Sequence, residues 1–314
     1  MSSPAGIVAA ALVAVVWPAW AMLPSGQIAL PVERATNIFF ARAVVNRAKP
    51  LWFTLDTGAN LSVIDPVAAR ALRLPVGEVH QQPGIGTGAG TTTVGRARGA
   101  SITVGQLPAF TPETLFVVPV RQLSGSFKHQ IDGVLGVDFM RGHVVEFNYA
   151  AGVVIFHDPR YFVYQGDAQV LPIELHQNLL VVLASLTMPD GEPLPVRLLI
   201  DTGRAGRPGL NGPFVREHRL VQRFAKLGQM ALAQGINGLT PAFRIEARAL
   251  TFGNLKLDRP ELDLSQATDG LSASEQYDGH IGASLLSRFR VFIDFPGHRM
   301  ILEKRSPTRH ATID

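Results

Sequence analysis

Two aspartates in this chain of 314 residues follow apolar segments, where burial of a charged carboxylate is energetically unfavourable. Asp56 ends the mostly apolar stretch 51–55, Asp201 ends the apolar run 198–200, and Thr-Gly follows each acid. A lone carboxylate in a buried strand loses its hydration, so each acid needs a partner. Asp-Thr-Gly is expected by chance in about one chain of this length in twenty. Its two copies indicate a repeat, and we expect the two acids to be partners of each other.

A second motif also occurs twice, downstream of each acid. DGVLGVDFMRGHVVEFNYAAGVVIF begins at Asp132 and DGHIGASLLSRFRVFIDFPGHRMIL begins at Asp278, which is 76 residues after Asp56 and 77 after Asp201. A third pair, ITVGQL and LTFGNL, lies between them in the same order. The chain therefore reads as a duplication with halves of about 145 residues.

The composition favours strands over helices. Among many Val, Ile, Leu and Thr, the chain has 30 glycines and 22 prolines, so turns are frequent and amphipathic helices are few. We predict β segments at 38–45 and 179–186, short helices at 137–141 and 283–289, and a closing hairpin in each half. The polar link 157–169 is the predicted boundary between an N-terminal lobe, 22–160, and a C-terminal lobe, 161–314.

The doubled pattern resembles the aspartic peptidases of the pepsin and retropepsin superfamily. It is most similar to bacterial exported retropepsin-like proteases with two fused repeats, over most of residues 28–304. The resemblance implies an all-β, bilobed fold with pseudo-two-fold symmetry and few short helices. It also implies that Asp56 and Asp201 are the catalytic acids, one from each lobe.

The same resemblance implies roles for the residues that follow the acids. The residues implied to support the loops are Thr57, Gly58, Thr202 and Gly203. The threonine hydroxyls would cross-bond the two loops, and the glycines would allow close approach and offer N–H groups to the carboxylates. The implied substrate-binding flap comprises Gly84, Ile85, Gly86 and Gly88, with GING at 235–238 as its second counterpart.

Two carboxylates about 3 Å apart cannot both ionise readily, so they share a proton and their pKa values split. The ionised acid takes a proton from a water held between the pair, and that water attacks the peptide carbonyl. The protonated acid stabilises the developing oxyanion and later helps to protonate the leaving amine. This chemistry needs no metal, nucleophilic side chain or organic cofactor.

Other chemistries lack their motifs. The chain has no Gly-x-Ser-x-Gly and no His-Glu-x-x-His, and its nine histidines do not have ligand spacing, so we expect no metal site. GIGTGA, from Gly84, formally fits a dinucleotide-binding pattern, but HQQP before it is not predicted to be a strand and TTTV after it does not start a helix. The net charge of +4 comes without a basic block interleaved with aromatics, so we expect no nucleic-acid partner.

The N-terminal segment 1–21 reads as a signal peptide. GIVAAALVAVV is too short for a comfortable membrane span, and Ala19-Trp20-Ala21 offers a cleavage site, although no Lys or Arg precedes the run. We expect a periplasmic or secreted protein with no stable membrane span once the segment is removed, and an anchored protein if it is kept. The chain has no cysteine, so its stability must come from packing.

The second half departs from the family pattern at two positions. Arg204 follows the second Asp-Thr-Gly, where Ala59 follows the first, and His280 interrupts the second aliphatic pair. None of the four tyrosines lies in the flap. We expect the Arg204 side chain to point outward, because it sits where the chain leaves the loop.

Three hypotheses follow. The first is an aspartic endopeptidase that acts as a monomer on extended segments of cell-envelope proteins, with apolar residues at the cut. The second is a catalytically inactive peptide-binding protein of the cell envelope, which Arg204 would favour. The third is a structural β protein whose acids hold an interlobe contact.

Overall fold

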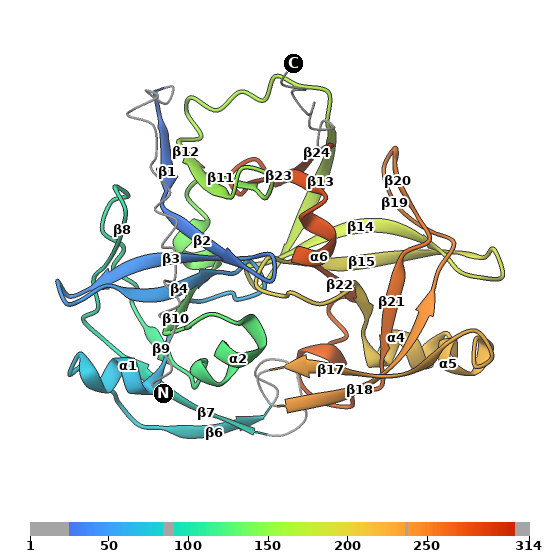
Figure 1. Ribbon diagram of the computed structural model, residues 1–314, viewed down its shortest axis with the longest axis horizontal. Coiled ribbons are helices and arrows are strands. Elements are labelled where there is room, and N and C mark those ends of the chain that lie inside the picture. Colours follow the sequence, from blue (N-terminus) through green and yellow to red (C-terminus); the bar gives the residue numbers. More distant parts are fainter. Residues whose placement is uncertain (1–24, 84–90, 236–237, 305–314) are drawn as a thin grey trace, which may run out of the picture.

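The computed structural model describes residues 25–83, 91–235 and 238–304. Figure 1 shows the two halves of the chain as lobes on opposite sides, with a group of strands from both halves between them. This arrangement confirms the predicted all-β, bilobed fold with few short helices. The connection between strands β12 and β13, residues 158–168, contains the predicted lobe boundary.

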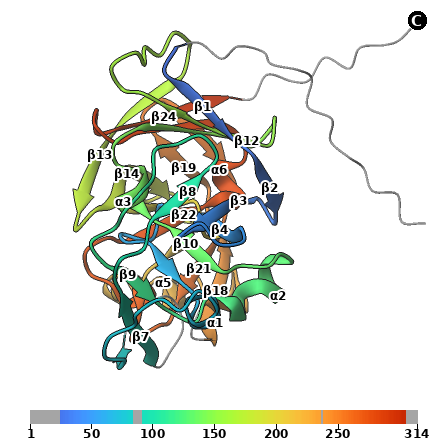
Figure 2. The ribbon, with the colours of Figure 1, turned by 90° about the vertical axis from the view of Figure 1, so that its left-hand side faces the viewer.

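One sheet of the described chain belongs to the N-terminal lobe. Its order is β2-β3-β4-β10-β5-β9-β7-β6, with β8 paired to β3. Figure 2 views the molecule from the side of this lobe. The strands are β2 (Val32–Ala35), β3 (Ile38–Val45), β4 (Leu51–Leu55), β5 (Val63–Ile64), β6 (His80–Pro83), β7 (Thr91–Ala97), β8 (Ile102–Val104), β9 (Leu115–Val117) and β10 (Gly133–Leu135).

A second, larger sheet runs from the N-terminal lobe through the C-terminal lobe. Its order is β1-β12-β11-β23-β24-β13-β14-β15-β22-β16-β21-β18-β17, with β19 paired to β14 and β20. Its strands are β1 (Gln27–Leu30), β11 (Val144–Asn148), β12 (Val153–His157), β13 (Gln169–His176), β14 (Leu179–Thr187), β15 (Pro193–Asp201), β16 (Gly209–Leu210), β17 (Gln229–Gly235), β18 (Gly238–Glu246), β19 (Ala249–Phe252), β20 (Leu255–Asp258), β21 (Glu261–Ser265), β22 (Gly279–Gly282), β23 (Phe289–Asp294) and β24 (Arg299–Lys304).

The helices of the described residues are short. They are α1 (Pro66–Ala71), α2 (Ser124–Phe127), α3 (Val137–Met140), α4 (Gly212–Glu217), α5 (Leu220–Arg223) and α6 (Ala283–Leu286), with 3-10 turns at Arg121–Leu123 and Leu271–Ala273. Asp65 begins α1 by accepting a hydrogen bond from the Val67 N–H at 2.8 Å, and Pro66 occupies the first helical position. None of these helices is long and apolar enough to cross a membrane, as far as the described residues go.

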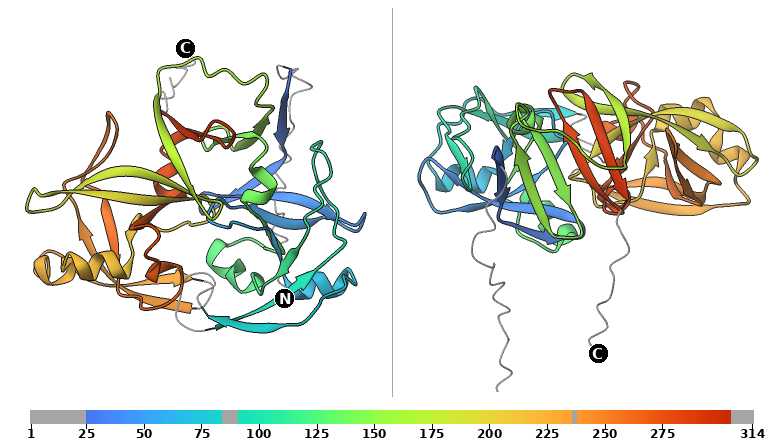
Figure 3. Two further views of the ribbon diagram at one scale, coloured as in Figure 1. Left: turned by 180° about the vertical axis from the view of Figure 1, so that it is seen from behind. Right: turned by 90° about the horizontal axis from the view of Figure 1, so that it is seen from above.

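The closing hairpins of the two halves join the lobes. Strand β11 pairs antiparallel with β23 from Val144 opposite Asp294 to Asn148 opposite Arg290. The view from above in Figure 3 shows these hairpins side by side between the lobes. The order β1-β12-β11-β23-β24-β13 therefore places three strands from each half in one continuous interlobe sheet.

A buried acid lies at this junction. Glu146 on β11 is fully buried and accepts a hydrogen bond from the Arg290 Nε of β23 at 2.6 Å, and its other oxygen lies 3.0 Å from His157 Nε2 on β12. Burial raises the pKa of Glu146, but its hydrogen bonds to His157 and Arg290 outweigh this and leave the pKa below its ordinary value. The ion pair between Glu146 and Arg290 thus links the lobes.

One apolar core extends through both lobes. It includes Phe53 and Leu55 of β4 and Ile200 of β15, all fully buried. These side chains precede the two Asp-Thr-Gly motifs, so the strands that carry the acids are anchored by packing on either side of the junction.

Two sequence-based expectations were wrong in detail. HQQP is a strand, β6, which pairs with β7 from His80 opposite Val94 to Pro83 opposite Thr91. The segment is polar, so its strand character comes from the partner strand and not from its own hydrophobicity. The second short helix ends at Leu286 instead of 289, because β23 begins at Phe289.

Candidate active site

Strands β4 and β15 place Asp56 and Asp201 at the junction of the lobes. Strand β4 runs parallel to β10, with Leu55 opposite Leu135, and the Asp56 N–H donates to the Leu135 carbonyl at 3.0 Å. Strand β15 runs parallel to β22 in the same way, with Ile200 opposite Ile281. The two halves therefore present their Asp-Thr-Gly loops by the same local construction.

The loops are joined by a ring of four hydrogen bonds. The Thr57 hydroxyl donates to the Ile200 carbonyl at 2.6 Å and accepts from the Thr202 N–H at 3.0 Å. The Thr202 hydroxyl donates to the Leu55 carbonyl at 2.9 Å and accepts from the Thr57 N–H at 3.0 Å. Both threonines are buried, so these bonds fix each loop to the other in a place that water does not reach.

The glycines of the two loops lie against the opposite acids. A Cβ atom at Gly58 would lie 2.6 Å from the Cγ of Asp201, and one at Gly203 would lie 2.2 Å from the Cγ of Asp56. Neither distance leaves room for a side chain. The Gly58 N–H also donates to Asp56 Oδ1 at 2.7 Å. The structure thus brings Asp56, Gly58, Asp201 and Gly203 together at one point.

The side chains of Asp56 and Asp201 lie within hydrogen-bonding reach of each other, and each residue is half-buried. Burial raises the pKa of Asp56, while hydrogen bonds from the Gly58 N–H and to Asp201 oppose the rise. Burial raises the pKa of Asp201 further above its ordinary value, and the charge of Asp56 adds to this effect. The pair therefore holds a shared proton at a pH at which two isolated carboxyl groups would both be ionised.

Arg204 lies close to Asp201, and the expectation that it points outward was wrong. Its Nε is fully buried and, among the described residues, has no hydrogen-bond partner. Its charge lowers the pKa of Asp201 but does not cancel the rise caused by burial and by Asp56. The Arg204 carbonyl accepts from the Ala283 N–H at 2.7 Å, which keeps this part of the loop against the start of α6.

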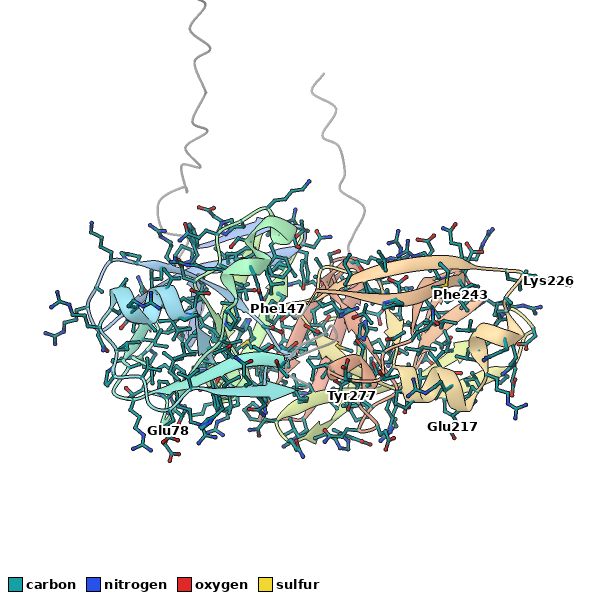
Figure 4. All side chains as sticks on the ribbon, turned by 90° about the horizontal axis from the view of Figure 1, so that it is seen from below. Glu78, Phe147, Glu217, Lys226, Phe243 and Tyr277 are labelled. Carbon is teal, nitrogen blue, oxygen red and sulfur yellow. The ribbon has the colours of Figure 1, made fainter. Side chains whose placement is uncertain are left out.

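Two tyrosines lie within electrostatic reach of Asp201. The hydroxyl of Tyr149 is buried without a hydrogen-bond partner in the described part of the chain, and burial, with a smaller effect of Asp201, raises its pKa. Burial and Asp201 also raise the pKa of Tyr277, to about 12. Figure 4 shows Tyr277 near the middle of the molecule. Sequence reasoning missed both residues, because they lie far from the acids along the chain.

Asp132 and Asp278 support the strands that carry the acids. Asp132 Oδ2 accepts from the Trp52 N–H at 3.0 Å, and Asp278 Oδ2 accepts from the Arg197 N–H at 2.8 Å. Each bonded N–H lies four residues before the acid of its own lobe. In the sequence these two aspartates mark the repeat, and their recurrence is the signal that could have predicted this supporting role.

The predicted flap residues Gly84, Ile85, Gly86 and Gly88 lie outside the described residues, as does part of GING at 235–238. The strands that flank them are described. They form the hairpins β6–β7 and β17–β18, one from each lobe, which extend toward each other in Figure 1. The substrate-binding role of the flap stays a prediction.

Among the described residues, no group of His, Asp and Glu side chains is arranged to hold a metal ion. The dyad region contains two carboxyls, the hydroxyls and N–H groups that hold them, and the Arg204 cation. These groups suit proton transfer to and from a water, with charge stabilised by the protein itself.

Comparison with known proteins bears on this site. Residues 41–139 match the family model described as aspartyl protease. The matched residues include Asp56. The second Asp-Thr-Gly lies beyond the matched residues, and the structure places it opposite the first.

Similar structures include basic 7S globulin from soybean, with 13% sequence identity and a TM-score of 0.48. The match covers 90% of this chain and 96% of the soybean chain. A comparison with curated protein sequences found no match.

Proposed function

We propose that this chain is an aspartic endopeptidase that hydrolyses peptide bonds in extended segments of proteins. The observation that carries the proposal is the coupled carboxyl pair, in which each acid lies against the glycine of the opposite loop. Ionised Asp56 takes a proton from a water held between the acids, and the water oxygen attacks the peptide carbonyl carbon. Protonated Asp201 donates to the carbonyl oxygen, which gives a tetrahedral gem-diol. The C–N bond then breaks as Asp56 passes its new proton to the nitrogen and a gem-diol hydroxyl returns a proton to Asp201.

The inactive peptide-binding alternative depends on Arg204. A cation beside the dyad would abolish catalysis if it held both acids in the ionised state. The pKa of Asp201 nevertheless stays well above its ordinary value with Arg204 in place, because burial and the Asp56 charge act more strongly. The shared proton is therefore retained, which supports the active form.

The test is cleavage of an unfolded protein, such as casein, by residues 22–314 across a range of pH. We expect wild-type protein to produce discrete fragments, and Asp56→Asn and Asp201→Asn variants to produce none. Asp258→Asn, which changes an exposed acid paired with Lys256, is the matched control and should cleave normally. If the Asp56→Asn or Asp201→Asn variant produced fragments in the same yield as wild-type protein, the proposal would be rejected. Peptide binding without cleavage by wild-type protein would support the inactive alternative.

We further propose that the chain is exported to the periplasm or secreted and that its substrates are exposed segments of cell-envelope proteins. The apolar run before Pro18 and the Ala19-Trp20-Ala21 site support export. N-terminal sequencing of the protein recovered after expression of the full chain in a bacterium should give a mature start at Met22. An intact N-terminus in the soluble cytoplasmic fraction would overturn the export proposal.

A further inference from the structure

Arg204 occupies in the second lobe the place that Ala59 occupies in the first. The Ala59 carbonyl accepts from the Val137 N–H at 2.8 Å, and the Arg204 carbonyl accepts from the Ala283 N–H at 2.7 Å. Each residue also follows its Asp-Thr-Gly directly. The lobes therefore share a backbone here and differ in charge, which is a local break in the pseudo-symmetry around the dyad.

The Arg204 side chain is a cation without an ion-pair partner. It makes no salt bridge within the described residues, and its buried Nε makes no hydrogen bond there. Burial lowers the pKa of Arg204, but an arginine remains protonated at any pH at which the protein is folded. A buried N–H donor without a partner is costly, so the Nε of this half-buried cation calls for an acceptor, and an anion suits its charge.

Neither acid near Arg204 is free to be that anion. Asp263 is within electrostatic reach, but it accepts a hydrogen bond from Arg244 Nε at 2.8 Å and is already paired. Asp201 belongs to the dyad and shares a proton with Asp56 there, because burial and the Asp56 charge raise its pKa. Tyr277 is also near, and its raised pKa keeps it neutral.

His280 lies within electrostatic reach of Arg204 and has a second unsatisfied nitrogen. Its side chain is buried, with 5% of the residue exposed, and its Nε2 has no hydrogen-bond partner among the described residues. Burial and the charge of Arg204 lower the pKa of His280, so the ring is neutral. A neutral imidazole still has one N–H to donate. In the first lobe the corresponding residue is Val134, which is apolar.

We propose that Arg204 and His280 form a subsite for a carboxylate, so that the substrate residue next to the cut on the Asp201 side is Asp or Glu. This rests on the proposed endopeptidase function and specifies its substrate class. The guanidinium presents N–H groups in a planar fork that fits a carboxylate, and the half-buried Arg204 residue remains partly accessible. On the Asp56 side, Ala59 and Val134 favour an apolar residue. The sequence-based expectation of apolar residues at the cut therefore applies only to the substrate residue on the Asp56 side of the peptide bond.

The test begins with the cleavage sites in casein, identified by mass spectrometry. Peptides are then made around one site, in matched pairs that differ only by Glu or Gln at each position flanking the bond. We expect wild-type protein to cleave the Glu peptide of one pair with kcat/KM at least about tenfold higher than its Gln partner, because a hydrogen bond to a charged group distinguishes them. The ratio should fall to about one in Arg204→Gln.

Several controls keep the test decisive. Arg207→Gln removes a nearby exposed arginine that pairs with Glu261, and it should preserve the wild-type ratio. His280→Gln offers a second variant in case Arg204→Gln fails to fold, and it should reduce the ratio. Absence of a Glu preference at both positions, or a ratio that persists in Arg204→Gln, would overturn the subsite.

Binding separates this inference from the proposed function. In the Asp56→Asn variant, fluorescence anisotropy should show tighter binding of the Glu peptide than of the Gln peptide. Cleavage without a Glu preference would reject the subsite and leave the endopeptidase intact. A Glu preference in binding without cleavage by wild-type protein would reject the endopeptidase and leave the subsite intact.

Discussion

Asp56 and Asp201 differ in one charged neighbour, because Arg204 acts on Asp201 and Ala59 has no charge to act on Asp56. Loss of the proton that the dyad shares should set the alkaline limb of the pH profile, and uptake of a second proton by the dyad should set the acid limb. These two titrations predict a maximum of peptidase activity between about pH 4 and 6.5.

Arg204→Gln should move the alkaline limb to higher pH. Removing the positive charge removes an effect that lowers the pKa of Asp201, so the proton is held to a higher pH, while the acid limb stays nearly in place. The measurement is kcat/KM against pH on a peptide without charged residues, with Arg204→Lys as the charge-preserving control. If the alkaline limb of Arg204→Gln lay at the same pH as that of wild-type protein, or at a lower pH, this account of the dyad would be contradicted.

Gly203→Ala should reduce kcat by about a hundredfold or more, because its Cβ would lie 2.2 Å from the Cγ of Asp56 and force the carboxyl out of place. Gly142→Ala is the matched control, since nothing lies within 4 Å of the added atom. Circular dichroism should show both variants folded. Full activity in Gly203→Ala would mean that the close approach of the loops is not needed for catalysis.

The two Asp-Thr-Gly loops behave as one element, because each threonine bonds to the other loop. Thr57→Val should lower the free energy of unfolding by about 2–4 kcal/mol, since it leaves the Thr202 N–H and the Ile200 carbonyl buried without partners. Urea denaturation measures this loss, and Thr57→Ser, which keeps the hydroxyl, should restore most of it. Equal stability of the Val and Ser variants would show that the cross-bonds contribute little.

The sequence was informative where a feature occurred twice. The doubled Asp-Thr-Gly predicted the fold and the meeting of the acids, and the strand 38–45 was predicted with its correct bounds. Partners contributed by distant segments were not visible. HQQP becomes a strand only because β7 pairs with it, and no local pattern around Arg204 reveals that its Nε is buried. Tyr149 and Tyr277 reach the dyad through tertiary packing, which no local pattern reveals.

At the scale of the whole molecule, both acids come from one chain, and we propose that the active unit is a monomer. Activity per chain should then be constant when the protein is diluted from micromolar to nanomolar concentrations. Analytical ultracentrifugation over the same range provides the comparison. A fall in specific activity on dilution, together with a change in sedimentation, would indicate that a dimer is needed.

The junction between the lobes should weaken in acid. The pKa of Glu146 is lowered in the folded protein from an ordinary value of 4.5, so the stability it contributes is present above that pH and is lost as the pH falls through the folded value. The urea midpoint of the wild-type protein should therefore drop more between about pH 5 and 3 than that of Glu146→Gln. Parallel pH dependence in the two proteins would assign acid sensitivity to other groups.

The interlobe sheet takes three strands from each half, and the only covalent tie between the halves is the connection 158–168. The two halves are thus arranged like the two different subunits of a dimer that a linker joins. Fragments 22–160 and 161–314, produced together as separate polypeptides, should reassociate through β11 and β23 and regain activity. The tether sets a high effective concentration of one half for the other, so its loss should make the activity of the split enzyme depend on dilution. If the mixed fragments are each folded but the mixture is inactive, the connection 158–168 does more than hold the two halves together.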